Sequence, residues 1–337
     1  MIEAAIGSLA AGEDLTLETM TETISLIMQG QCRPEEIGLF LTGLAMKGET
    51  VAEIAGAAAA MRRHMRPITT DRTGLVDTCG TGGDASHTFN VSTAAAIVTA
   101  AAGVPVAKHG NRAATSVSGS ADVLAELGVN IQADLPCVEA CLEELGLCFC
   151  FAPLWHVSMK QVAEVRRSLG IRTIFNLLGP LTNPAGAPYQ LLGVGDNSLR
   201  PKLAEALALL GTEGAFVVTG SDGLDEVTLA DTTNVTQVGH GPPREIVWKP
   251  EDFGIARASL DPIRIKSAAE SAAMIRSMLA GDRGPARDIV ILNSAAAILV
   301  AQSATDPMIA AHRAAEAIDS GAARDILARL AQLSHAD

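Results

Sequence analysis

The chain has 337 residues, enough to bury a large core as one large domain or as two domains of modest size. Its formal net charge of −13 argues against non-specific binding to nucleic acid or to an anionic membrane, because both need a positive field. Aromatic residues make up only 3% of the sequence, so the core has to be built from Ala, Leu, Val and Ile.

The N-terminus and the longest apolar runs predict a soluble, cytoplasmic protein. Met1–Ala10 has no basic segment and contains Glu3, unlike a secretory signal. The apolar runs 94–107 and 289–301 are too short to span a bilayer. The cysteines form no C-x-x-C pair, which favours reduced thiols over a zinc site or disulfides.

The first seventy or so residues have the pattern of helices. Apolar residues recur with the helical period between Leu17 and Met28, and a second helix is expected over 34–48 between a Pro and a Gly. Thr50 and Glu53 have the spacing of a capping box before an alanine-rich helix, which Pro67 ends. The apolar stripes of this block predict core or subunit-interface faces.

From residue 75 onward, strand and helix patterns alternate. The expected strands are short apolar runs at 75–79, 104–108, 147–151, 190–194 and 215–219. The expected helices lie at 121–127, 138–145, 200–210 and 268–279. A further helix over 158–169 interrupts the rhythm before the Pro-, Gly- and Asn-rich stretch 179–186. Such alternation predicts an α/β fold with a mostly parallel sheet covered on both faces.

The segment 75–122 carries the strongest functional signal. Its first strand leads into the glycine-rich sequence Gly80–Asp84, and a small-residue helix begins near Ser92. Glycines leave backbone N–H groups accessible, and a helix N-terminus adds partial positive charge, so the pair favours an anion. The second strand ends on Lys108–Arg112, at the sheet edge where open α/β sheets bind ligands. These features predict a phosphate-rich ligand; the alternative is a glycine-rich turn without a ligand.

Known phosphate motifs fit this loop poorly. Gly80–Ala85 also satisfies G-x-G-x-x-A, the dinucleotide fingerprint, which expects an acidic residue about 20 residues later. Lys108 and His109 occupy that region instead, and no Lys-Ser/Thr pair follows the glycines as in a P-loop. Asp84 within the loop suits a bound cation or a sugar hydroxyl better than bare pyrophosphate.

Several linked motifs resemble one family. GTGGD, TFNVST, KHGNR and SGSAD occur in this order between residues 80 and 122, followed by VRRSLGIRTIFNLLGPLTNP over 165–184 and GLDEV over 223–227. Together they resemble the anthranilate phosphoribosyltransferases, which join anthranilate to phosphoribosyl pyrophosphate (PRPP) in tryptophan biosynthesis. The resemblance covers essentially the whole chain.

The resemblance implies a fold and an assembly. The expected fold is nucleoside phosphorylase/phosphoribosyltransferase-like, with a small N-terminal helical domain and a larger α/β domain around a mostly parallel sheet. The helical domain is expected over 1–72, joined by about 165–188, and the PRPP-binding α/β domain over 73–164 and 189–337. The usual assembly of the family is a homodimer. Neither nucleic acid nor membrane is an expected partner.

The resemblance also implies site residues, matched position by position. The expected substrate contacts include Gly80, Gly83, Asp84, Thr88, Asn90, Val91, Ser92, Thr93, Lys108, His109, Gly110, Arg112, Ala113, Ala114, Thr115, Ser116 and Ser120, of which the glycine-rich loop, the start of the helix and Lys108 match contacts to PRPP. Asn111 and Arg166 match contacts to anthranilate, where the guanidinium pairs with the carboxylate. Ser92, Asp225 and Glu226 match ligands of Mg²⁺, with two ions expected per subunit. No residue is assigned as a catalytic base, because an aromatic amine already has a neutral lone pair at pH 7.

Several of these positions could also have a structural role that involves no ligand. Arg166 resembles a solvated helix residue, and the neighbouring Arg167 and Arg172 make the choice ambiguous. Without the resemblance, Asp225 and Glu226 would be an exposed turn. His109 is assigned to binding, and His156 near the acceptor channel has an equally plausible packing role.

Three departures and three rival functions complete the prediction. Ala85, Val117 and Val157 differ from the family's commonest residues, and Val117 removes a possible phosphate contact. The rivals are a pyrimidine nucleoside phosphorylase, a non-catalytic paralogue that binds nucleic acid or a partner, and a dinucleotide-dependent oxidoreductase. The net charge and the intact metal-ligand candidates argue against the paralogue.

Overall fold

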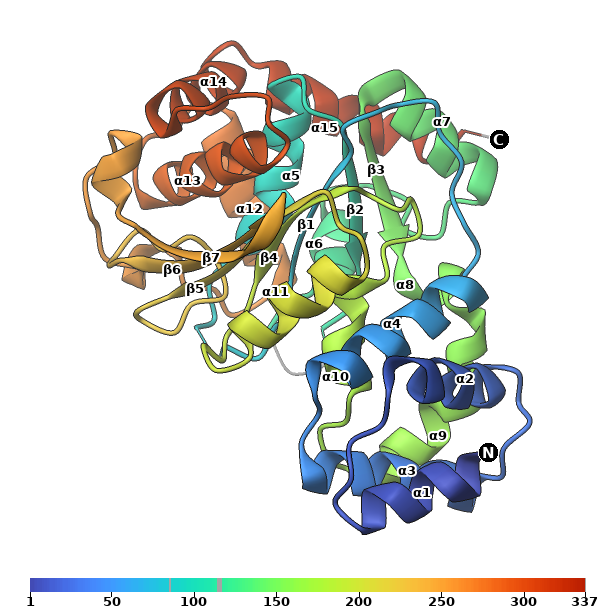
Figure 1. The fold of residues 1–337 in the computed structure, drawn as a ribbon. Helices are drawn as coiled ribbons and strands as arrows, with labels where there is room; N and C mark the ends of the chain where they lie inside the picture. Colours follow the sequence, from blue (N-terminus) through green and yellow to red (C-terminus); the bar gives the residue numbers. More distant parts are fainter. Residues whose placement is uncertain (85, 114–116, 337) are drawn as a thin grey trace.

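The computed structural model describes residues 1–84, 86–113 and 117–336, as a helical block beside an α/β part (Figure 1). The first four helices are α1 (Ile2–Ala10), α2 (Leu17–Met28), α3 (Pro34–Lys47) and α4 (Val51–His64). The capping box predicted before α4 is present, because Thr50 Oγ1 accepts from the Glu53 N–H and Glu53 accepts from the Thr50 N–H.

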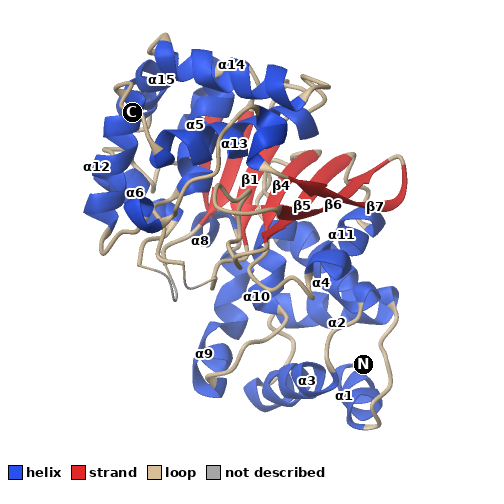
Figure 2. Cartoon of the chain, turned by 90° about the vertical axis from the view of Figure 1, so that its left-hand side faces the viewer, coloured by secondary structure: helices blue, strands red, loops and turns tan. Residues whose placement is uncertain are grey.

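A seven-stranded sheet forms the centre of the α/β part (Figure 2). Its strands are β1 (Val76–Gly80), β2 (Val106–Gly110), β3 (Leu147–Phe151), β4 (Tyr189–Gly193), β5 (Gly214–Gly220), β6 (Thr233–Gly239) and β7 (Gly241–Trp248). Their order is β3-β2-β1-β4-β5-β6-β7. The first five strands pair in parallel, whereas β6 pairs antiparallel with both β5 and β7. The mostly parallel sheet predicted from the sequence is therefore confirmed. The five predicted strands lie within two residues of their observed bounds, whereas the hairpin of β6 and β7 was not predicted.

The remaining helices follow the strands or connect them. They are α5 (Val91–Ala101), α6 (Ser120–Glu126), α7 (Leu135–Leu145), α8 (Ala152–Trp155), α9 (Lys160–Leu169), α10 (Phe175–Leu178), α11 (Arg200–Leu209), α12 (Ala268–Leu279), α13 (Pro285–Val300), α14 (Pro307–Asp319) and α15 (Ala322–Leu333). Helices α5 and α13 pack on one face of the sheet, and α11 packs on the other face against both β5 and α4. Both faces are thus covered, as buried parallel strands require.

The helical block includes segments from the middle of the chain. Helix α9 packs against α2 and α3, and α10 packs against α4 (Figure 1). One apolar cluster unites these helices with α11 and with residues such as Leu192 and Val217 on the sheet. On this packing we propose that about 165–188 joins residues 1–72 in one helical domain. The chain would then cross between the domains three times.

Within the described residues, none of the helices has both the length and the apolar character needed to cross a membrane.

Candidate active site

The site lies where the order of the parallel strands reverses. From β1 the chain proceeds to β2 and β3 on one side, and later to β4 and β5 on the other. Ligands bind at the carboxyl ends of strands at such a switch point. Strands β1 and β4 both end in glycine there, and these residues, Gly80 and Gly193, lie opposite each other in the register. The absence of side chains leaves room for the loop that carries Asp225 to pass over both ends.

A first cavity of about 290 Å³, here called the loop cavity, opens between the glycine-rich loop and the loop after β2. It brings together most of the residues predicted to bind substrate or metal. These are Gly80, Gly83, Asp84, Thr88, Asn90, Val91, Ser92, Lys108, His109, Gly110, Asn111, Arg112, Ala113, Ser120, Asp225 and Glu226. The sequence motifs therefore converge in space, although 134 residues separate Ser92 from Glu226.

Four of the predicted residues are not placed in this cavity. Thr93 is almost fully buried, and its hydroxyl has no hydrogen-bond partner among the described residues. Its side chain packs in the core. Only its backbone N–H, in the first turn of α5, could contact a ligand. Ala114, Thr115 and Ser116, like Ala85, lie outside the described residues.

Asp225 and Glu226 are held by backbone N–H groups rather than exposed in a turn. Gly82 N donates to Asp225 Oδ2 at 3.0 Å, and Ser92 N donates to Glu226 Oε1 at 3.0 Å. Burial, and then the charge of Asp84, raises the pKa of Asp225 from 3.8 to about 7. Burial and the charge of Asp225 likewise raise the pKa of Glu226. By surface area both residues are half-buried, so the turn is not fully exposed, and the carboxylates form a region short of positive charge.

Two observations indicate that the region around Asp225 and Glu226 suits a divalent cation bound together with the substrate. Asp84 Oδ2 is buried and has no hydrogen-bond partner among the described residues, although Asp84 faces Asp225. The described part of the chain contains no cluster of three or more His, Cys, Asp or Glu side chains arranged to hold a metal ion alone. A divalent ion here would need oxygen ligands from the substrate as well, as Mg²⁺ usually takes them.

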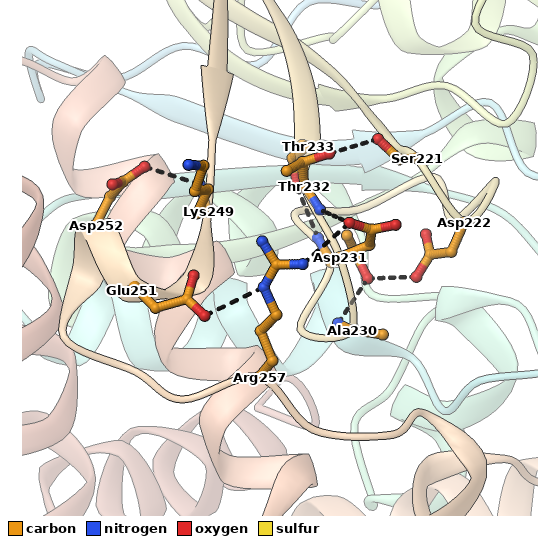
Figure 3. A network of polar contacts seen from close by, with 11 residues as sticks. Ser221, Asp222, Ala230, Asp231, Thr232, Thr233, Lys249, Glu251, Asp252 and Arg257 are labelled. Carbon is orange, nitrogen blue, oxygen red and sulfur yellow. Dashed lines mark hydrogen bonds and ion pairs between the residues drawn. The ribbon is translucent and has the colours of Figure 1, made fainter.

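A network of polar contacts lies at the two ends of the loop that carries Asp225 and Glu226 (Figure 3). Asp222 accepts from the Leu224 N–H at 3.2 Å and from Thr228 Oγ1 at 2.6 Å. Ser221 and Thr232 join the two ends of the loop through hydroxyls 2.7 Å apart. Arg257 then bridges Asp231 and Glu251, so the network continues beyond the loop (Figure 3). These contacts hold the two ends of the loop together, and Asp225 and Glu226 between them line the cavity.

Lys108 is placed in the floor of the loop cavity. Its ammonium donates to the Thr78 carbonyl and, at 3.3 Å, to Ser92 Oγ. Burial lowers its pKa, and the charge of Asp77 is the largest of the opposing effects. Lys108 thus lines the cavity in which a phosphate contact is predicted, and the charges of Asp77 and Glu226 favour its protonated form.

A second cavity of about 670 Å³, the helix-side cavity, lies between the sheet and the helical block. Arg166 lines it and stacks on the Phe175 ring, with 5.5 Å between the guanidinium carbon and the ring centroid. Arg167 and Arg172 are exposed, and neither is among the described residues that line this cavity. The structure thus singles out Arg166 among the three arginines.

His109 and His156 form a buried pair at the junction of the cavities. Their Nε2 atoms are 3.2 Å apart, and His109 Nδ1 lies 3.0 Å from the Gly179 carbonyl oxygen. Burial is the main cause that lowers the pKa of His109 to about 3 and that of His156 to about 4. Both rings are therefore neutral near pH 7.

Some supporting residues were missed from the sequence. Asn293 in α13 accepts from the Val227 N–H at 2.9 Å and donates to the Val227 carbonyl at 3.0 Å, directly after the carboxylate pair. Two adjacent polar residues, Asn293 and Ser294, inside the otherwise apolar run 289–300 were the only available signal. Gly193 carried no signal, because its role depends on a loop 32 residues later in the chain.

Comparison with known proteins agrees with this geometry. Residues 72–324 match the profile of the glycosyl transferase family, a/b domain, and residues 3–65 match that of its helical bundle domain. Anthranilate phosphoribosyltransferase from Moorella thermoacetica is 49% identical over 323 residues, covering 96% of this chain and 95% of the relative.

Two solved structures extend the comparison. The Thermus thermophilus anthranilate phosphoribosyltransferase superposes with a TM-score of 0.92 at 41% identity, over 98% of this chain and 99% of that one. The Saccharomyces cerevisiae enzyme, solved in complex with PRPP and Mg, gives a TM-score of 0.90 at 29% identity, over 99% of this chain and 97% of that one.

Proposed function

The chain belongs to the anthranilate phosphoribosyltransferase family, and on that premise we propose how its residues divide the work of the reaction. The enzyme transfers the phosphoribosyl group of PRPP to the amine of anthranilate. The products are N-(5-phosphoribosyl)anthranilate and pyrophosphate, and the reaction is a step of tryptophan biosynthesis.

The observation that carries our assignment is the shared wall of the two cavities. The residues common to both linings come from the ends of β1 and β2: Cys79, Gly80, Thr81, His109, Gly110, Asn111 and Arg112. A group transfer needs the anomeric carbon and the attacking amine at one place, and aligning them supplies much of the catalysis. PRPP is assigned to the loop cavity and anthranilate to the helix-side cavity, so the two meet at this wall.

The loop cavity suits a polyanion together with Mg²⁺. Asp225, Glu226 and Ser92 Oγ are assigned to hold the ions, with Asp84 facing them, and two ions per subunit are proposed. Bound Mg²⁺ supplies positive charge that stabilises the departing pyrophosphate. The backbone N–H groups of the glycine-rich loop and of the first turn of α5 contribute further positive potential toward the phosphates.

Arg166 is assigned to the carboxylate of anthranilate. Arg166→Ala should raise the KM for anthranilate roughly 30-fold, since a hydrogen bond to a charged group contributes about 2 kcal/mol, with little change in the KM for PRPP. Arg167→Ala is the matched control, because it removes the same charge one residue away from an exposed position. Steady-state kinetics with each substrate varied in turn make the measurement. Equal effects of the two variants would contradict the assignment.

A homodimer held by the helical block is the proposed assembly. Helix α3 exposes Leu39 and Met46, which are 62% and 83% accessible, on the block that carries the apolar stripes. Light scattering at micromolar concentration should give twice the mass of one 34.8 kDa chain. A monomer mass under the same conditions removes this proposal. The cytoplasm is the proposed compartment.

A thermal-shift screen separates the proposed function from its rivals. PRPP should raise the melting temperature, and more so with Mg²⁺, because a ligand that binds only the folded state stabilises it. NAD⁺ and pyrimidine nucleosides should have no such effect. Stabilisation by a nucleoside in place of PRPP would favour a phosphorylase, and stabilisation by NAD⁺ an oxidoreductase.

A further inference from the structure

The side chain of Asn90 joins three distant segments of the chain at the edge of the loop cavity. Asn90 immediately precedes α5, and its amide oxygen accepts hydrogen bonds from Ser118 Oγ at 2.8 Å and from Ser271 Oγ at 2.7 Å. Its amide nitrogen donates to the Ser118 carbonyl at 3.0 Å. Its backbone N–H donates to Ser271 Oγ at 3.0 Å. The residue is therefore fixed through both its backbone and its side chain.

These contacts fix which way the amide of Asn90 faces. If the amide turned by half a rotation, its oxygen would meet the Ser118 carbonyl, and two acceptors would repel each other. In the observed orientation the oxygen has two hydroxyl donors, which fill its two lone pairs. An amide nitrogen carries two N–H groups, and among the described residues one of them is used. The second is left for a ligand in the loop cavity, which Asn90 lines.

Ser271 holds Asn90 without reaching the cavity. It lies in the first turns of α12, is 0% exposed, and is not among the described residues that line the loop cavity. The chain just before α12 is also attached to the segment that leads into α5. Phe89 N donates to the Ile263 carbonyl at 3.0 Å, and Ile265 N donates to the His87 carbonyl at 2.8 Å. This segment is thereby supported from behind by another about 180 residues away in the chain.

We propose that Ser271 is a positioning residue for the donor substrate. By bonding both the backbone N–H and the side-chain oxygen of Asn90, it aims the second amide N–H at a phosphate or hydroxyl oxygen of PRPP. The inference rests on the proposed function, since it assigns the loop cavity to PRPP. It adds a residue that touches neither substrate and affects only the one bound next to Asn90.

The test compares two buried serines. Ser271 contacts Asn90, the residue before α5, and Ser294 contacts α5 itself. Ser271→Ala should raise the KM for PRPP about tenfold, because a buried N–H loses its acceptor and the amide is freed to turn, while the KM for anthranilate stays near wild type. Ser294→Ala is the control: Ser294 is also 0% exposed and donates to the Ala95 carbonyl of α5 at 3.3 Å, away from the cavity. It should leave both KM values unchanged.

Two further variants keep the inference open to contradiction. Ser271→Cys fills almost the same space with a weak donor, so it tests the hydrogen bonds even where Ser271→Ala folds poorly, and its KM for PRPP should also rise. In an Asn90→Ala background, Ser271→Cys should change that KM much less than in wild type, because the amide it orients is gone and only the backbone N–H of residue 90 remains as its partner.

If the wild type is active and Ser271→Cys leaves the KM for PRPP unchanged, the positioning role is wrong. An equal rise of the KM for PRPP in Ser294→Ala would also contradict it, as would effects of Ser271→Cys and Asn90→Ala on this KM that simply add. A wild type that does not turn over anthranilate and PRPP contradicts the proposed function itself and removes the premise of the inference.

Discussion

Replacing Asp225 and Glu226 by Asn and Gln is expected to reduce turnover by about 100-fold or more. Metal ions contribute several kcal/mol of charge stabilisation to a reaction of this kind, and the amides bind Mg²⁺ much more weakly than carboxylates. The Mg²⁺ concentration needed for half-maximal rate should rise in parallel. Initial rates measured over a Mg²⁺ titration at saturating PRPP and anthranilate test both effects.

The same variant should fold at least as well as wild type near pH 7. A carboxyl group whose pKa is raised on folding, as for Asp225 from 3.8 to about 7, favours the folded state below the lower value and loses that contribution as pH rises toward the upper one. Neutral amides escape this loss, so the melting temperature without metal should not fall. Wild-type turnover with unchanged Mg²⁺ dependence would contradict the metal assignment, whereas an unfolded variant would contradict the predicted charge repulsion.

Gly193→Ala is expected to abolish activity and to destabilise the fold by about 3 kcal/mol or more, at the upper end of overpacking effects. A Cβ atom on Gly193 would lie 1.6 Å from the carbonyl oxygen of Asp225. Both groups belong to the backbone, so neither can move aside as a side chain would. The loop that carries the carboxylate pair would have to lift from the ends of β1 and β4, and the metal-binding geometry would be lost.

Gly239→Ala is the matched control for this substitution. Gly239 also ends a strand of the same sheet, but its added Cβ would meet its nearest neighbour, the Glu213 carbonyl oxygen, at an ordinary 3.9 Å. Its activity should equal that of wild type, and its unfolding midpoint in urea should change little. If Gly193→Ala retained wild-type turnover, the close approach of the Asp225 loop to β4 could not be required for catalysis.

Local sequence patterns were sufficient for most of the fold. Strands β1 to β5 are short apolar runs bounded by Gly or polar residues, and the helices between them have the expected period. The hairpin of β6 and β7 was missed, because β7 begins with Gly-Pro-Pro and its residues are largely exposed, so it has no continuous apolar run. An edge strand tolerates proline where a central strand does not.

The composition of the site followed from motifs, but its geometry did not. The glycine-rich loop, Lys108 and the carboxylate pair were predicted, and the structure brings them to one cavity. The partial burial of Asp225 and Glu226, by contrast, depends on the crossing of their loop over Gly80 and Gly193, which no local pattern encodes. Ser271 and Asn293 were missed for the same reason, since each acts on a residue far away in the sequence.

Loss of anthranilate fluorescence, followed with purified protein, PRPP and Mg²⁺, is the direct test of the proposed phosphoribosyl transfer. We expect a decrease that requires all three components and that stops when Mg²⁺ is chelated, with release of one pyrophosphate for each anthranilate consumed. Fluorescence that stays constant with folded protein and both substrates would contradict the assignment of the two cavities to this reaction.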